Sequence, residues 1–242
     1  MAPPKESPVA AKKPRLPRVF VIRHGETEWS LSGQHASLSL SFSTGLTDIP
    51  LTSHGESIVR QLGTRIVGKG KILDPAHIQH VFVSPRQRAQ KTYDLLFQDV
   101  DKKPSCSVEE DVREWEYGVC EGKTTSTIRS EIGDDWDIWT MGCPEGESPD
   151  QIRDRCDRVI KKIVDMADAH HGKEDTEGHH GDIVVVSHGH FSRCFITRWC
   201  QLEISQGRIF VADTGALHKL GFQHRNFEER SLLGLNLYSV NE

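Results

Sequence analysis

Basic side chains follow three apolar runs of this sequence, at the point where each run ends. Arg23 and His24 follow the first run, Arg86 follows the second, and His188 follows the third. Two imidazoles and two guanidinium groups without acidic neighbours form a site for an anion. A phosphoryl group fits such a site well, because one guanidinium group can bind two of its oxygens at once.

The apolar runs themselves are typical of strands that are buried on both faces. They comprise residues 19–22, 80–83 and 183–186, and they show no regular polar alternation. Ligands of open α/β sheets bind beyond the carboxyl ends of the strands. If the three strands are neighbours, the four basic residues therefore meet at one place. A single His after a strand is usually an ordinary loop residue, but three strand ends with the same chemistry argue against that interpretation.

Helical periodicity separates these predicted strands. Apolar residues recur every four positions from Ile58 to Ile66, and a longer apolar stripe runs from Ile152 to Ala167. Residues 148–151 give the longer helix a serine cap, a proline at its first position and a capping-box glutamine. Strands that alternate with helices predict an α/β domain. We expect a three-layer α/β/α sandwich with a mainly parallel central sheet.

These residues lie in motifs that resemble those of a known family. Arg23-His24-Gly25 resembles the signature of the histidine phosphatase superfamily, which includes the cofactor-dependent phosphoglycerate mutases. The resemblance continues, in order, through residues 45–52, 84–86, 112–118 and 188–190. Residues 113–118 and the tryptophan-rich stretch 136–139 are most similar to the fungal sedoheptulose-1,7-bisphosphatase group. The resemblance implies a phosphoglycerate mutase-like fold.

The resemblance also implies catalytic roles for five residues. His24 is expected to attack phosphorus and become phosphohistidine, while Arg23, Arg86 and His188 neutralise the phosphoryl oxygens. Glu114 is expected to protonate the departing sugar oxygen and then to accept a proton from the attacking water. Side chains would supply all of the positive charge, so we expect neither a metal nor another cofactor.

A wider set of substrate contacts is implied by the same family pattern. The set is Ser30, Thr44, Gly45, Trp115, Glu116, Tyr117 and Arg193. Core packing is the alternative for Trp115 and Tyr117, because aromatic side chains are often buried. Arg193 is expected to bind the second phosphate of a bisphosphate, with a surface ion pair as the alternative.

Two segments are expected to lie beside the pocket, and the first of them departs from the family pattern. Residues 36–43 look like an insertion, rich in Ser and Leu, where the family usually has a short link. The insertion is either a lid element or an artefact of the gene model. Residues 119–147 are expected to form a partial lid over the pocket.

The composition is that of an ordinary globular protein. The chain has 242 residues and a net charge of −5, which argues against broad nucleic-acid binding. No apolar run is long enough to span a membrane, and no CxxC pair is present among the six cysteines. Residues 1–17 are expected to be a flexible Pro- and Lys-rich tail before a catalytic domain at 18–242. We expect a cytoplasmic protein. Lys12-Lys13-Pro14-Arg15 fits a weak nuclear-localisation signal, which would also place the protein in the nucleus, but a solvated tail is the favoured interpretation.

Three functions are compatible with these observations. The favoured function is a phosphatase that acts on small phosphorylated metabolites, such as sedoheptulose-1,7-bisphosphate. A phosphoglycerate mutase would use the same chemistry, but Ser30 stands where mutases usually have Asn. A non-catalytic module that binds phosphorylated ligands is disfavoured, because all five expected catalytic residues are present. Assembly into homo-oligomers is left open.

Overall fold

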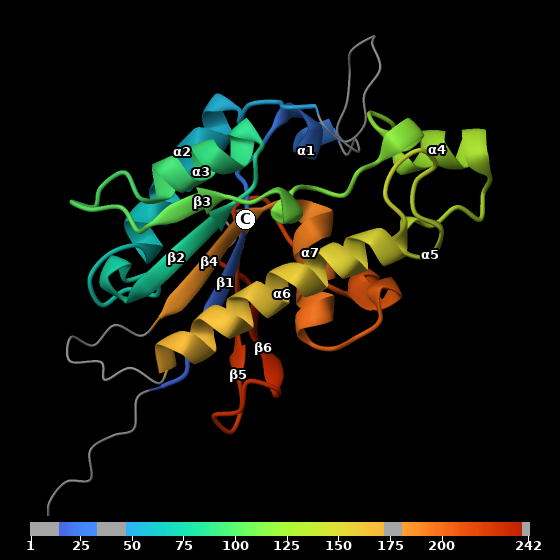
Figure 1. Ribbon diagram of the computed structural model, residues 1–242. Helices are drawn as coiled ribbons and strands as arrows, with labels where there is room; N and C mark the ends of the chain where they lie inside the picture. The colour runs from blue at the N-terminus through green and yellow to red at the C-terminus, as the bar shows by residue number, and fades with distance from the viewer. Residues whose placement is uncertain (1–14, 33–46, 172–180, 239–242) are drawn as a thin grey trace, which may run out of the picture.

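The central sheet has six strands in the order β3-β2-β4-β1-β5-β6 (Figure 1). The computed structural model describes residues 15–32, 47–171 and 181–238. The strands are β1 (Val19–Arg23), β2 (Ile78–Val83), β3 (Cys106–Val108), β4 (Asp182–Ser187), β5 (Leu217–Phe222) and β6 (Arg230–Leu237). The α-helices are α1 (Glu28–Ser32), α2 (Ser53–Ile66), α3 (Gln87–Leu96), α4 (Thr125–Ile132), α5 (Ile138–Met141), α6 (Pro149–His171) and α7 (Gly189–Trp199). Four short 3₁₀ helices are η1 (Pro75–His77), η2 (Glu110–Val112), η3 (Gly118–Cys120) and η4 (Ile204–Ile209).

The three apolar runs form the parallel centre of the sheet, as the sequence predicts. Strand β4 lies between β1 and β2 and is parallel to both. Arg23 at the end of β1 pairs with Ser187 at the end of β4, and Val83 of β2 pairs with Val186. The carboxyl ends of all three strands are therefore level, which brings the residues that follow them to one edge. Strands β5 and β6 add an antiparallel pair beside β1.

Helices cover both faces of the sheet and complete the three layers (Figure 1). Alternate residues of β1 point to opposite faces, as in any strand. Phe20 and Ile22 pack into the cluster that includes α2 and α3, whereas Val19 and Val21 pack into the cluster that includes α6 and α7. The prediction of an α/β/α sandwich is confirmed.

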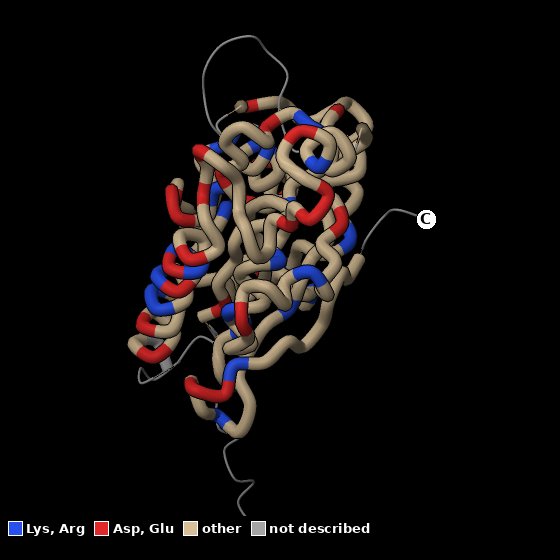
Figure 2. The backbone as a smooth tube through the Cα atoms, turned by 90° about the vertical axis from the view of Figure 1, so that its right-hand side faces the viewer, with Lys and Arg blue, Asp and Glu red and all other residues tan. Residues whose placement is uncertain are grey.

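The start of helix α6 has the predicted capping box. The backbone N–H of Gln151 donates to Oγ of Ser148 at 3.2 Å, and the backbone N–H of Ser148 donates to Oε1 of Gln151 at 2.8 Å. Pro149 occupies the first position of the helix, where a missing N–H costs nothing. Acidic and basic residues then lie side by side along α6 (Figure 2).

Residues 119–147 carry α4 and α5 and are anchored to the core. Trp136, Ile138, Trp139 and Cys143 are buried in the same hydrophobic cluster as α6 and α7. The function of this segment as a lid stays a prediction. The inserted residues 36–43 and residues 1–14 of the expected tail lie outside the described residues. Within the described parts of the chain, no helix is long and apolar enough to cross a membrane.

Candidate active site

His24 follows β1 directly, and one of its ring nitrogens is unprotonated. Its backbone N–H donates to the Ser187 carbonyl at 2.8 Å, which continues the ladder with β4. Nδ1 lies 2.7 Å from the Gly25 carbonyl oxygen. A carbonyl only accepts, so Nδ1 carries the proton and Nε2 is the lone-pair nitrogen. Nε of Arg88 donates to this Nε2 at 3.3 Å.

The surroundings of His24 keep its imidazole neutral. Burial lowers the pKa of His24 well below its usual value, and the positive charges of Arg88 and Arg23 lower it further. A neutral imidazole with Nε2 unprotonated is the form that can act as a nucleophile. The local structure thus sets both the tautomer and the charge that such a reaction requires.

His188 lies behind His24, in the interior of the protein. The two rings meet edge to face with centroids 5.0 Å apart, and Nε2 of His188 lies 2.6 Å from Oγ of Ser84. Burial lowers the pKa of His188 well below its usual value, with further lowering by the charge of Arg88. His188 does not line the cavity described below, so its side chain supports His24 from the interior.

Arg23 is a partly buried cation that lies across the start of helix α7. Its Nη1 donates to the Ala212 carbonyl at 2.7 Å. A Cβ atom at Gly189 would lie only 3.2 Å from Cζ of Arg23, so the glycine provides the space for this guanidinium group. Burial lowers the pKa of Arg23, while the carboxylates of Glu114 and Asp213 oppose that effect.

Glu114 is held by the N-terminus of helix α7. Its Oε1 accepts backbone N–H bonds from Phe191 at 2.8 Å and from Trp115 at 2.9 Å. Its Oε2 accepts the backbone N–H of His190 at 3.2 Å. Helix N-termini favour anionic groups, because their N–H groups point outward and lack partners within the helix. The end of β4 therefore positions His188 and, through α7, also the Glu114 carboxyl group.

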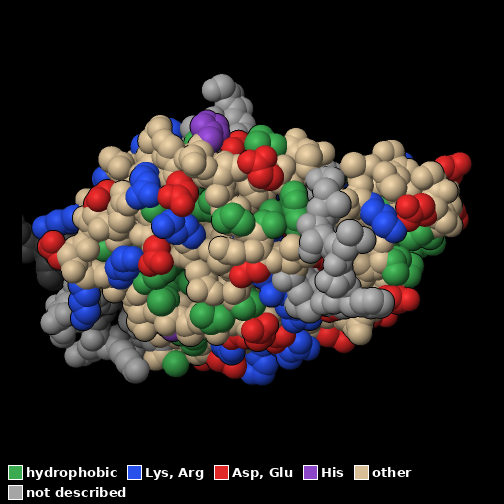
Figure 3. Space-filling view, turned by 90° about the horizontal axis from the view of Figure 1, so that it is seen from above, with side chains coloured by type: hydrophobic (Ala, Val, Ile, Leu, Met, Phe, Trp, Pro, Cys, Tyr) green, Lys and Arg blue, Asp and Glu red, His purple; other side chains and the backbone are tan. Residues whose placement is uncertain are grey.

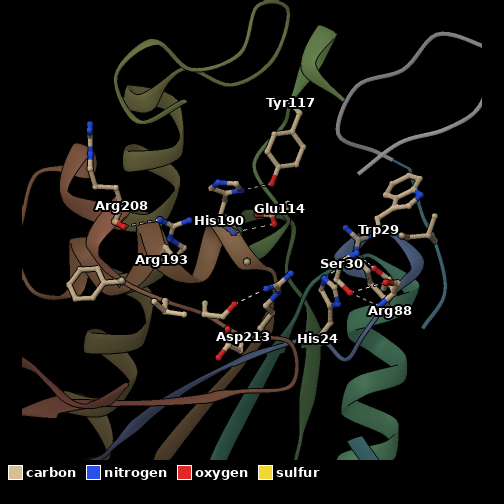
Figure 4. A pocket seen from close by; sticks show the side chains of 17 residues that line it. His24, Trp29, Ser30, Arg88, Glu114, Tyr117, His190, Arg193, Arg208 and Asp213 are labelled. Carbon is tan, nitrogen blue, oxygen red and sulfur yellow. Dashed lines mark hydrogen bonds between the residues drawn. The ribbon is translucent and has the colours of Figure 1, made fainter. Parts of the chain in front are cut away.

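Arg23, His24 and Glu114 border a cavity of about 420 Å³. Figure 4 shows His24 and Arg88 on one wall, with Glu114, His190 and Arg193 on another. Tyr117 OH lies 2.7 Å from Nδ1 of His190. Seen from above, acidic and basic side chains are interspersed with apolar ones on the surface (Figure 3). Inside the cavity, the buried Arg88 and the partly buried Arg23 concentrate positive charge.

Comparison with known proteins assigns nearly the whole chain to one family. A family model, that of the histidine phosphatase superfamily (branch 1), matches residues 19–233. The chain belongs to the histidine phosphatase superfamily. It is 38% identical to sedoheptulose 1,7-bisphosphatase of Saccharomyces cerevisiae, covering 89% of this chain and 91% of the relative. It is 36% identical to an acid phosphatase of Mycobacterium tuberculosis, covering 90% and 92%.

Solved structures agree with this assignment. The structure of the Mycobacterium tuberculosis open reading frame Rv3214 has a TM-score of 0.72 and 34% identity, covering 92% of this chain and 98% of that one. A mycobacterial glucosyl-3-phosphoglycerate phosphatase in complex with VO3 has a TM-score of 0.71 at 18% identity, covering 91% and 99%, and therefore shares the fold. This histidine phosphatase is a phosphoric monoester hydrolase.

The structure separates the two arginines that follow β2. Arg88 is buried and lines the cavity of the phosphatase, whereas Arg86 is the N-cap residue of α3 and does not. The charge of Arg86 still contributes to the lowered pKa of His188. Sequence reasoning named Arg86 and missed Arg88. Both arginines belong to the motif after β2, so the sequence points to this place. They lie at the N-cap and the second position of α3, so their side chains point in different directions, and only Arg88 faces the cavity.

The expected substrate contacts divide into three groups. Ser30, Tyr117 and Arg193 line the cavity. Trp115 is fully buried in the core, and Glu116 borders a separate polar depression beside α6. Thr44 and Gly45 lie outside the described residues. Residues 114–117 belong to no helix or strand, and their side chains point in different directions: Tyr117 lines the cavity, whereas Trp115 faces the core.

The cavity also contains residues that the sequence did not single out for it. His190 and Asp213 line it, together with the short apolar stretch from Phe210 to Ala212. His190 belongs to the motif of residues 188–190 that resembles the family, so the sequence did contain a signal for it. The stretch before β5 carries no comparable motif. Among the residues that the structure describes, no group of three or more His, Cys, Asp or Glu side chains is arranged to hold a metal ion.

Proposed function

We propose that this protein hydrolyses sugar phosphates, and sugar bisphosphates in particular, through a phosphohistidine formed on His24. The observation that carries the proposal is the hydrogen bonding of His24. Nδ1 donates to the Gly25 carbonyl, and Nε2 keeps its lone pair toward Arg88 and the cavity. A histidine placed to attack phosphorus needs this tautomer.

In the first step, Nε2 of His24 attacks phosphorus and the ester P–O bond breaks. Glu114 delivers a proton to the departing sugar oxygen, which leaves as an alcohol. Arg23 and Arg88 balance the negative charge of the phosphoryl oxygens, because both guanidinium groups line the cavity beside His24. A phosphoryl dianion beside His24 also favours the protonated form of His188, and Arg86 adds positive potential from the start of α3.

In the second step, a water molecule attacks phosphorus and the P–N bond to His24 breaks. Glu114 accepts the proton of that water, and inorganic phosphate leaves with His24 neutral again. Glu114 thus alternates between acid and base. Its three backbone N–H bonds hold the carboxyl group in one orientation for both transfers. Side chains supply all of the positive charge in this proposal, so no cofactor takes part.

Arg193 favours a substrate with a second anionic group. It lines the cavity on the wall opposite Arg88, where its guanidinium group lies over the Trp139 ring at 4.5 Å (Figure 4). Its Nε and Nη2 donate to the carbonyls of Gly207 and Arg208 at 3.2 and 3.1 Å, which fixes its orientation. Sedoheptulose-1,7-bisphosphate is our preferred substrate, in keeping with the name of the yeast relative. A cytoplasmic site of action belongs to the same proposal.

Phosphate release from a panel of compounds tests this proposal. The panel contains sedoheptulose-1,7-bisphosphate, fructose-1,6-bisphosphate, 3-phosphoglycerate and a phosphopeptide, each assayed in EDTA beside His24→Ala. We expect release that survives EDTA, is lost in His24→Ala and is fastest with a sugar bisphosphate. Isomerisation of 3-phosphoglycerate without phosphate release would instead indicate a mutase. Preference for a monophosphate would contradict the assignment of Arg193.

A further inference from the structure

Arg155 of helix α6 is buried, and every hydrogen-bond donor of its side chain is used. Nε and Nη2 bind the two carboxylate oxygens of Glu147 at 2.8 and 2.7 Å. Nη1 donates to the carbonyls of Asp111 and Arg113, each at 2.8 Å, and Nη2 also donates to the Glu114 carbonyl at 3.3 Å. A guanidinium group has five N–H donors, so this set is complete. Three of the five bonds hold the backbone that carries Glu114.

Glu147 holds the same segment from the other side. Its Oε2 accepts the backbone N–H of Glu116 at 2.9 Å, and its own backbone N–H donates to the Glu116 carbonyl at 2.9 Å. Its carbonyl accepts Nε1–H of Trp115 at 3.0 Å. A Cβ atom at Gly146 would lie 2.2 Å from the Glu116 carbonyl oxygen, so the two segments meet backbone to backbone.

Arg155 also contacts the group that holds the Glu114 carboxylate. Its guanidinium carbon lies 5.2 Å from the centre of the Phe191 ring, and the backbone N–H of Phe191 donates to Oε1 of Glu114 at 2.8 Å. The Arg155 side chain therefore contacts both the backbone of Glu114 and the start of α7. A small displacement of Arg155 would move both of the elements that orient the Glu114 carboxyl group.

We infer that Arg155 and Glu147 are positioning residues that aim the Glu114 carboxyl group at the oxygen of the leaving group. This inference rests on the proposed function, in which Glu114 acts as the acid and base. A buried ion pair is by itself weak evidence of a stabilising role, because apolar replacements are often equally stable. Three of the five bonds of Arg155 end on the short segment that carries Glu114, and the other two hold Glu147, which binds the same segment. A positioning role explains this arrangement. Lysine keeps the positive charge but offers three donors and no planar fork, so it cannot hold this segment.

The dependence of rate on the leaving group tests the inference. An alkoxide of a sugar needs a proton as it departs, whereas p-nitrophenolate is stable as an anion near neutral pH. The measurement is kcat/KM for a sugar phosphate and for p-nitrophenyl phosphate, because kcat/KM reports the steps up to the departure of the alcohol. Glu114→Gln should lower the value for the sugar phosphate by about 100-fold and that for p-nitrophenyl phosphate by less than about tenfold. Arg155→Lys should show the same asymmetry, with losses of about tenfold and about twofold.

Arg158→Lys is the matched control, because Arg158 lies on the same helix but binds only the side chain of Asp111. We expect it to leave both rates within about twofold of wild type, in line with the small worth of an exposed pair. Equal losses with the two substrates in Arg155→Lys, beside an asymmetric loss in Glu114→Gln, would overturn the inference alone. Equal losses in Glu114→Gln, or no turnover by the wild type, would remove the proposed function and the inference together.

Circular dichroism and thermal melting show whether each variant is folded. If Arg155→Lys fails to fold, Glu147→Gln takes its place and is expected to show the asymmetry between the two leaving groups. Failure of both variants to fold would overturn the inference, since the pair would then be structural.

Discussion

Arg86 and Arg88, which are separated by one residue, differ in their contacts with Nε2 of His24. Nε of Arg88 donates to Nε2 of His24 at 3.3 Å, and its Nη1 donates to the Thr47 carbonyl at 3.2 Å. Arg86 caps α3 and lies outside the cavity wall. The buried guanidinium group is therefore the one that can touch a phosphoryl oxygen on its way to His24.

We predict unequal effects of truncating these arginines. Arg88→Ala should lower kcat/KM about 10²- to 10³-fold, because a preorganised cation at the phosphoryl group is lost. Arg86→Ala should lower it less than about tenfold, since its charge acts from a distance. Steady-state kinetics on the best sugar phosphate, with melting temperatures for both variants, would measure this. Equal losses, or a larger loss for Arg86→Ala, would show that the side chain seen on His24 is not the one used in turnover.

At the scale of elements, the junction between β4 and α7 organises the site. The strand ends at Ser187, and the next residues supply His188 and the N–H groups that bind Glu114. Gly189 begins the helix without a side chain, which lets Arg23 lie against it. Apolar periodicity predicts both elements, but it does not predict that Glu114, about 75 residues earlier in the chain, docks on the helix start.

Gly189→Ala tests how closely these elements must meet. A Cβ atom 3.2 Å from Cζ of Arg23 must displace the guanidinium group by a few tenths of an ångström. We expect kcat/KM to fall about tenfold or more, because small misplacements of charged groups are costly in catalysis. The melting temperature should change by only a few degrees, since alanine favours helix. A normal rate, or a large loss of melting temperature with an unchanged rate in the folded enzyme, would refute the contact.

At the scale of the whole molecule, burial of histidine links stability to pH. His218 of β5 is buried, and its Nδ1 accepts the backbone N–H of Asn236 at 3.0 Å. Burial lowers the pKa of His218 from 6.5 to about 4. Between these values the unfolded chain binds a proton that the folded chain does not, so the free energy of unfolding falls as the pH falls.

We predict that His218 alone accounts for about 3 kcal/mol of the stability lost between pH 6.5 and 4. His218→Gln keeps an acceptor for Asn236 and cannot be protonated, so its stability should fall by that much less over this range. The buried His24 and His188 add to the loss in both proteins and cancel in the comparison. Urea unfolding at several pH values would measure the difference. Parallel stability curves for the variant and the wild type would contradict the prediction.

The sequence predicts the parts of this molecule that local patterns determine. Three valine-rich runs predict the central parallel strands β1, β2 and β4, but not the short parallel strand β3 at the edge. The residues that follow the runs include Arg23, His24 and His188. The antiparallel pair β5 and β6 carries no such pattern, because Lys219 and Gly221 interrupt the apolar residues of β5. Which of Arg86 and Arg88 faces the cavity depends on where α3 begins, because a side chain at the N-cap and one at the second position point in different directions. Trp115 packs into the core through contacts with residues that are distant in sequence.

Trapping the enzyme during a single turnover tests whether His24 carries the phosphoryl group. Enzyme in excess over sugar bisphosphate is quenched in base, digested and mapped by mass spectrometry. We predict a phosphoryl group on the peptide that contains His24, bound at Nε2, and no such peptide from His24→Ala. Turnover without a phosphorylated His24, or a His24→Ala enzyme that still releases phosphate, would contradict the account.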